Sequence, residues 1–356
     1  MYSILHFHLF RGHNFMKKTL IPLFFILCCS SLLFLLLIYS KECIALASNG
    51  LLIWFHKMIP TLFPFMVLSG FLVRSGLSYK LGNFLRPILG ILLPLPSHML
   101  YVVFMGFLCG FPMGAKIVAD MIDNKQITKK EGQYLLSFCN NIGPLYMLGY
   151  VIPLFQYSNT GFILILMYSV PILFGLFSYF RLFSPSNYKS TKELSLKNRT
   201  TEIMNAKYTA KSIDYTIVAS GNYLNCFQES LSSAIEQITL LGGCMVFFNT
   251  LLIIPLKIIS SLLPIQSISH INYMQGIFCS LIEIGGGLQQ FASITTDKSF
   301  FALSPYFIIS LLTFGGLSCI LQTFFIIKNT GLNIFTYIKH KTIQSCIYIL
   351  LYTIFN

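Results

Sequence analysis

The stretch GFLCGFPMGAKIVADMIDNKQITKKEGQYLLSFCNNIGP, residues 106–144, holds the features that decide the fold of this protein. It places Gly110, Pro112 and Gly114 inside an apolar segment, followed closely by the charged Lys116. Glycine and proline interrupt helices, and the unpaired backbone groups are tolerated in a membrane only where protein or a wet cavity shields them from lipid. We therefore interpret CGFPMGAK as the tip of a hairpin. The alternative is a single kinked helix that packs closely through its glycines.

The composition indicates that the chain lies in a membrane. Of its 356 residues, 55% are hydrophobic and 10% charged, and the mean hydropathy is +0.73. The net charge of +13 fits basic loops at the cytoplasmic face, so we expect no nucleic-acid partner. Because about 20 apolar residues cross a bilayer, we predict an all-α polytopic membrane protein with about 7 transmembrane helices. The predicted spans lie near 19–39, 52–73, 133–153, 161–181, 231–255 and 301–327, with a shorter one near 342–355.

Two further apolar segments, near 98–118 and 272–294, are interrupted by glycines. If each crossed the membrane once, the basic stretch from Arg181 to Lys211 would lie outside, against the positive-inside rule. If both are re-entrant hairpins and the N-terminus is cytoplasmic, most basic residues, including Lys341, face the cytoplasm. Only Lys41, Lys57, Lys257 and Lys298 then remain outside. The charges favour two hairpins, and they determine the first more firmly than the second.

Three short motifs recur in the second half of the chain. An inverted repeat of helix, hairpin and helix explains their order, and the predicted topology runs the two halves in opposite directions. Such repeats are common in secondary transporters, which hold a polar site where the broken segments meet. The matches pair PFMV (64–67) with GCMV (243–246), GFLCGFPMG (106–114) with GIFCSLIEIG (276–285), and LLSFCNN (135–141) with LLTFGGL (311–317).

The chain therefore divides into five parts. The N-terminal tail and first helix are followed by two repeat halves, which a basic cytoplasmic linker joins, and by a short hydrophobic segment. Within the first half, SYKLGNFLRPILGILLPLP (78–96) reads as an interfacial segment because prolines and charges interrupt it. The boundaries of the five parts are 1–45, 46–181, 182–230, 231–330 and 331–356.

Polar residues and glycines at membrane depth form the candidate site. Glu283 is the strongest candidate because a carboxylate in apolar surroundings usually faces a cavity, a cation or a proton route; a shallow position in contact with water is its alternative. Lys116 could instead pair with Asp120 at i+4, and Asn140 and Asn141 could join helices. The candidate solute-binding residues are Gly110, Pro112, Gly114, Lys116, Asn140, Asn141, Gly143, Glu283, Gly285, Gly286, Gln289, Gly315, Gly316 and Ser318.

No motif points to a metal, a cofactor or catalysis. The ten cysteines are scattered through the chain without CxxC spacing, and the histidines form no metal-binding pattern. The sequence also lacks HExxH, GxSxG and Walker motifs and a pair of intramembrane aspartates. We expect no metal, no cofactor, no disulfide and no enzymatic activity.

Four motifs together resemble the bacterial sporulation integral membrane protein family, part of a wider nucleoside-recognition or Gate-domain group. They are PTLFPFMVLSGFL (60–72), GFPMGAK (110–116), CNNIGP (139–144) and FGGLS (314–318). The resemblance covers roughly residues 45–330. It implies a multi-pass protein of the bacterial plasma membrane that is needed for spore formation, with the spore cortex as its expected target.

Two functions follow from these expectations. The first is a transporter-like or gating protein that moves or binds a small polar solute, with nucleoside-like compounds among the candidates. The second is a non-transporting scaffold that assembles a sporulation complex. The expected partners are the lipid bilayer, a small polar solute, and either further copies of the chain or other sporulation membrane proteins.

Overall fold

A computed structural model of the chain describes residues 22–183, 223–262, 268–293 and 304–355. Within these ranges every regular element is a helix, which confirms the all-α prediction. Five helical segments of this part are long and apolar enough to cross a membrane, or six if one bent pair counts as a span. This is fewer than the predicted seven. The protein is thus a multi-pass helical membrane protein; the N-terminal tail, most of the basic linker and Lys298 lie outside the described residues.

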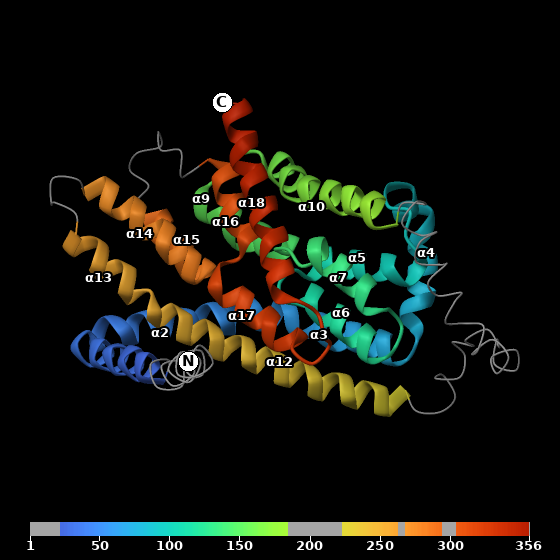
Figure 1. Cartoon of the computed structure of the whole chain (residues 1–356), viewed down its shortest axis with the longest axis horizontal. Helices are drawn as coiled ribbons and strands as arrows, with labels where there is room; N and C mark the ends of the chain where they lie inside the picture. The colour runs from blue at the N-terminus through green and yellow to red at the C-terminus, as the bar shows by residue number, and fades with distance from the viewer. Residues whose placement is uncertain (1–21, 184–222, 263–267, 294–303, 356) are drawn as a thin grey trace, which may run out of the picture.

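Two long antiparallel rods run side by side along one edge of the molecule (Figure 1). The first joins α2 (Ser40–Ile53), the π-helix η1 (Trp54–Met58) and α3 (Ile59–Arg74); the second is α12 (Tyr223–Leu251). Gly50 contacts Asn249, and at the opposite end Arg74 contacts Ser230. Equivalent helices of inverted repeats are expected to run in these opposite directions. A further helix, Pro22–Ile38, precedes the first rod, and α13 (Ile253–Leu262) follows the second.

The predicted interfacial segment forms a helix of its own. Helix α4 (Leu77–Leu92) meets α5 (Ser97–Cys109) at a bend of 81°. A side chain at Gly82 would overlap the backbone of Ser97, so the two helices touch at that point.

The first half contains two helix breaks that lie against each other. Helices α5 and α6 (Met113–Asp123) are separated at residues 110–112, so the predicted tip is indeed a break. The predicted span over 133–153 lies within Lys129–Phe155, a helical segment long and apolar enough to cross a membrane, but this segment is interrupted. Helix α7 (Lys129–Cys139) ends, and the chain restarts as α8 (Pro144–Tyr146), η2 (Met147–Val151) and α9 (Ile152–Phe155). The proline at the start of α8 explains this, because the residue before a proline avoids the helical conformation.

Glycines allow these two breaks to come into backbone contact. A Cβ atom added to Gly106 or to Gly114 would lie 2.5 Å from the carbonyl oxygen of Cys139, and one added to Gly110 would lie 2.2 Å from the nitrogen of Gly143. Because contacts this short exclude any side chain, the glycines at intervals of four residues determine how closely the segments approach.

The second half repeats the arrangement. Helices α14 (Ile268–Ile282) and α15 (Ile284–Ser293) fold back on each other, and α16 (Pro305–Phe314) is broken from α17 (Gly316–Ile327). A Cβ atom on Gly316 would meet the carbonyl oxygens of Ser280, Leu281 and Ile282 at 2.9–3.3 Å. The break between α16 and α17 therefore lies against the end of α14, as the two breaks of the first half lie against each other. The predicted span over 301–327 corresponds to Pro305–Ile327, a segment long and apolar enough to cross a membrane, and two glycines with positive φ interrupt it near its centre.

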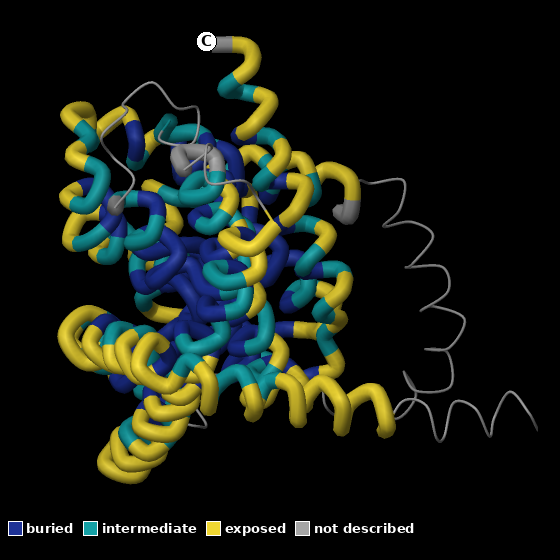
Figure 2. Tube along the Cα trace, turned by 90° about the vertical axis from the view of Figure 1, so that its left-hand side faces the viewer, coloured by how far each residue is buried: buried dark blue, intermediate teal, exposed yellow. Residues whose placement is uncertain are grey.

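Two long helices complete the fold. Helix α10 (Thr160–Phe183) packs on the outside, whereas α18 (Ile334–Phe355) packs against α7 and α16 (Figure 1). Buried residues concentrate where the broken helices meet, and exposed residues cover the periphery (Figure 2). The segment predicted as a short span near 342–355 is thus a longer helix, several of whose side chains are fully buried.

Candidate functional site

The broken helices surround a cavity of about 50 Å³. One water needs roughly 10–15 Å³ measured in this way, so the cavity has room for a few water molecules. Its wall draws on η1, α3, α5, α12 and α17 and on the breaks before α6, α8 and α15. The lining residues are Met58, Thr61, Leu62, Cys109, Phe111, Ile142, Gly143, Leu145, Tyr146, Leu241, Met245, Glu283, Ile284, Cys319 and Gln322.

Glu283 lines this cavity from the break between α14 and α15, and only 3% of it is exposed. Its carboxylate accepts hydrogen bonds from the backbone N–H of Gly286, at 2.6 Å, and from that of Gly285. It therefore caps the first turn of α15, where free N–H groups and the helix dipole favour negative charge. The side-chain amide of Asn249 on α12 donates a further hydrogen bond at 3.1 Å. Glu283 is thus enclosed by the protein and not exposed at its surface.

The neighbouring predicted residues, Gly285, Gly286 and Gln289, do not line the cavity. A Cβ atom added to Gly286 would lie 2.1 Å from Asn249 Oδ1, so the Asn249 side chain packs directly against Gly286. The carbonyl of Gly285 accepts a hydrogen bond from the Tyr150 hydroxyl at 3.0 Å, and Gln289 accepts one from the side-chain amide of Asn49.

The two predicted asparagines are buried but do not line the cavity. Asn140 Oδ1 accepts from the backbone N–H of Ala115, and Asn140 Nδ2 donates to Thr323 Oγ1 at 3.1 Å and to the Tyr337 hydroxyl at 3.0 Å. Asn141 Nδ2 donates to the carbonyl of Phe138, while its Oδ1 accepts from Lys341 Nζ at 2.6 Å. Asn140 thus joins α6, α17 and α18, as expected of an amide that connects membrane helices.

Lys341 is a buried cation that sequence reasoning assigned to the cytoplasm. It is 0% exposed, and its ammonium lies 5.2 Å from the ring centre of Phe111, a residue of the cavity wall. None of the ion pairs between described residues includes it. The available sequence signal was a stripe on one helix face at intervals of four, three and four residues: Tyr337, Lys341, Gln344 and Tyr348, all fully buried.

Replacing Lys341 with methionine is expected to raise the melting temperature of the purified protein. The change removes a buried charge whose desolvation costs several kcal/mol, and it leaves a neutral amide oxygen unpaired at about 1–3 kcal/mol. The matched control is Lys339→Met, at an exposed position of the same helix, which should leave the melting temperature unchanged. A lower melting temperature for Lys341→Met would show that the ammonium stabilises the fold.

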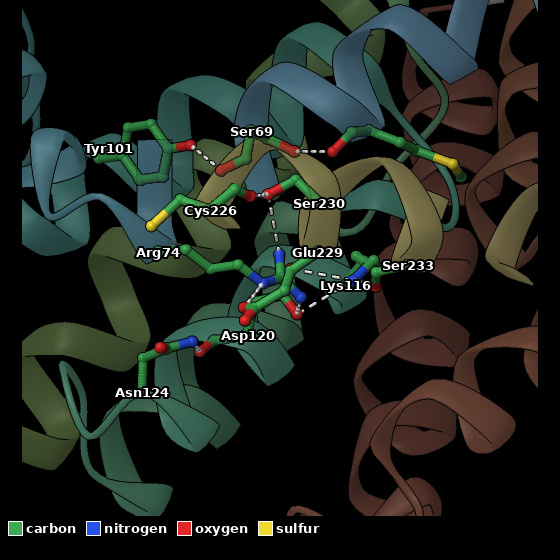
Figure 3. A network of polar contacts seen from close by, with 11 residues as sticks. Ser69, Arg74, Tyr101, Lys116, Asp120, Asn124, Cys226, Glu229, Ser230 and Ser233 are labelled. Atoms are coloured by element: carbon green, nitrogen blue, oxygen red, sulfur yellow. Dashed lines mark hydrogen bonds and ion pairs between the residues drawn. The ribbon is translucent and has the colours of Figure 1, made fainter. Parts of the chain in front are cut away.

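Lys116 belongs to a polar network away from the cavity (Figure 3). Its ammonium contacts both carboxylate oxygens of Asp120 at 3.0 Å and Ser233 Oγ at 2.9 Å. Arg74 lies 3.9 Å from Asp120 and 3.7 Å from Glu229. Lys116 therefore does not line the cavity, and it forms the i,i+4 ion pair with Asp120 that was its predicted alternative. The network connects α6 with α3 and α12.

The other predicted residues shape the backbone around the site. Gly110 and Pro112 lie in the break between α5 and α6, and Gly114 lies in the first turn of α6. Gly315 separates α16 from α17, and Gly316 begins α17. Ser318 Oγ accepts a hydrogen bond from Gln322 Nε2 at 3.0 Å, and Gln322 lines the cavity. Of the predicted set, Gly143 and Glu283 line the cavity themselves. Thr61, Tyr146 and Asn249 were missed, because nothing in their local sequence marks them.

Fold and site define a class of protein: a multi-pass helical membrane protein in which interrupted helices meet at a small cavity with a buried carboxylate. The chain is similar to the sporulation integral membrane protein YlbJ of Bacillus subtilis (strain 168), with 26% identity over 212 residues. The similar region covers 57% of this chain and 49% of that protein, so the chain spans about half the length of the curated relative that it matches. No family model and no solved structure matches the chain.

Proposed function

We propose that this protein is a transporter-like, sporulation-associated protein of the bacterial plasma membrane that binds and moves a small polar solute. The convergence of helix breaks on one cavity with a buried carboxylate, Glu283, carries the proposal. Broken membrane helices leave N–H and C=O groups free at their ends, and such ends bind solutes and ions in transporters. The role in sporulation rests on the name of the similar protein.

In this proposal α5–α6 and α14–α15 are re-entrant hairpins of two inverted repeats, and the N-terminus is cytoplasmic. The antiparallel packing of α2–α3 on α12 supports this arrangement, as do the break-on-break contacts in both halves. Pockets for drug-sized ligands measure about 300–1,000 Å³. The cavity of about 50 Å³ must therefore widen to admit a nucleoside-like solute, which relative movement of the two halves would accomplish.

Movement of a solute is favoured over the alternatives of catalysis and scaffolding by the position of the carboxylate. An enzyme would need a nucleophile activated by a base. The cavity wall includes the thiols of Cys109 and Cys319, but the described hydrogen bonds of Glu283 run to Gly285, Gly286 and Asn249 and not to either thiol. A scaffold would have no need of a buried charge at an internal cavity.

Spore formation in Bacillus subtilis that lacks YlbJ tests the proposal. We expect the wild-type chain to restore heat-resistant spores, and Glu283→Gln, which removes the charge with little change in shape, to reduce them at least tenfold. The matched control is Glu229→Gln, 69% exposed in the polar network, which should behave as wild type. Uptake of labelled uridine into proteoliposomes then examines one candidate solute. Full complementation by Glu283→Gln at equal membrane abundance would contradict a role for the cavity and favour the scaffold.

A further inference from the structure

Buried oxygen atoms without a partner gather around the break between α14 and α15. Among the described residues, five buried side-chain N or O atoms have no hydrogen-bond partner, and three of them are Tyr146 Oη, Asn249 Oδ1 and Ser280 Oγ. Tyr146 lines the cavity, Asn249 bonds to Glu283, and Ser280 lies one helical turn before Glu283 on α14. Buried polar atoms are nearly always paired, so such a cluster indicates a missing ligand or water.

The orientation of the Asn249 amide shows what kind of ligand is missing. Its nitrogen donates to the carbonyl of Met245 at 2.9 Å and to Glu283 at 3.1 Å. Both partners are acceptors, which fixes the amide and leaves Oδ1 as an unpaired acceptor in a residue that is 0% exposed. Only a hydrogen-bond donor or a cation can satisfy this oxygen.

The negative charge of the cavity wall also favours a cation as the missing ligand. Glu283 contributes a carboxylate, and none of the lining residues is lysine, arginine or histidine. The buried Lys341 donates to Asn141 and is not part of the cavity wall. The N-terminus of α15 offsets only part of the negative charge, since a helix end is equivalent to roughly half an elementary charge.

We propose that the cavity binds a small monovalent cation, either an alkali metal ion or an ammonium ion, with the oxygens of Glu283 and Tyr146, both in the cavity wall, as its ligands. One carboxylate matches one positive charge, and oxygen ligands suit hard cations. A cavity of about 50 Å³ holds such an ion with one or two waters. This inference rests on the proposed function, because it names a ligand of the same cavity.

The only tryptophan of the chain provides a built-in reporter. Trp54 donates from Nε1 to the carbonyl of Ile238 at 2.9 Å, packs against Gly242, and lies one turn before the cavity residue Met58. We would titrate the purified full chain with NaCl, KCl or NH₄Cl, keeping chloride and ionic strength constant with choline chloride. A saturable change in Trp54 fluorescence, together with a higher melting temperature, is expected with at least one of these cations. Bound ligand stabilises the folded state in proportion to its occupancy.

Two variants separate binding from a general salt effect. Glu283→Gln is expected to lower the affinity for the cation at least tenfold. Tyr146→Phe, which removes only the hydroxyl, is expected to lower this affinity several-fold. Glu229→Gln should titrate as wild type. If Glu283→Gln does not fold, the titration of Tyr146→Phe alone tests whether the cavity oxygens bind the cation. Responses equal to that of choline chloride, or variants that titrate as wild type, would overturn the inference and leave water as the partner of the oxygens.

The outcome can be told apart from that of the proposed function, because cation binding is measured without any solute. Glu283-dependent spore formation with no cation response would overturn the cation site alone. A cation response with Glu283-independent spore formation would overturn the proposed role of the cavity and leave the cation site in place.

Discussion

Replacing Gly110 with alanine is expected to prevent the protein from accumulating in folded form. Gly110 has φ +83° and ψ −167°, a conformation open in practice only to glycine. An added Cβ would lie 2.2 Å from the nitrogen and 2.7 Å from the Cα of Gly143. These are backbone atoms of the crossing segment and cannot rotate away. We expect a loss of at least about 4 kcal/mol, which is large against the 5–15 kcal/mol that stabilises a typical protein.

The amount of monodisperse protein extracted from membranes, followed by its melting temperature, measures this effect. Gly149→Ala is the matched control, because a Cβ there meets no atom within 4 Å. In a helix alanine is favoured over glycine by about 1 kcal/mol, so this variant should be as stable as wild type or slightly more so. A Gly110→Ala protein that extracts and melts like wild type would contradict the tight crossing of the two breaks.

Removing the Asp120 carboxylate is expected to have the second largest effect. The side chains of Lys116 and Asp120 are only 6% and 12% exposed, and Arg74 approaches the same carboxylate (Figure 3). Asp120→Ala would leave the Lys116 ammonium buried without a counter-charge. Breaking a buried ion pair in this way costs about 3–5 kcal/mol, so a marked fall in melting temperature is expected.

A double variant distinguishes the loss of a pair from the loss of packing. Lys116→Met combined with Asp120→Leu removes both charges and keeps apolar volume, and it should recover most of the lost stability. Glu229→Gln should change stability by less than about 1 kcal/mol, because this carboxylate is 69% exposed. If the double variant melts as low as Asp120→Ala, the ion pair is not the source of the effect.

Local sequence predicted the breaks within 98–118 and 272–294, but not the two breaks that lie against them. The Gly-Phe-Pro tip of residues 110–112 interrupts the helix because of its own residues, so the sequence was sufficient there. The segments with Asn140 and with Gly315 were read as polar clusters inside continuous spans, because their apolar flanks together had the length of a membrane helix. The structure shows that they are breaks, each covered by the break of a neighbouring helix.

The candidate site was predicted only in part for a related reason. Glu283 stood out because a carboxylate among apolar residues is costly wherever it lies. Its partner Asn249 is 34 residues away, and the partner of Lys341, Asn141, is 200 residues away. Lys341 looked like a lysine at a membrane edge, because a lysine near the start of an apolar helix can extend its side chain to water.

The sequence by itself determined that the chain lies in a membrane, that it is helical, and where glycine and proline interrupt a regular helix. These properties depend on each residue and its immediate neighbours. Only the tertiary structure decided which polar groups meet: Glu283 with Asn249 at the cavity, Lys341 with Asn141 beside it, and Lys116 with Asp120 away from it. The physical reason is that a backbone conformation is set locally, whereas the surroundings of a buried charge are set by the helices that pack around it.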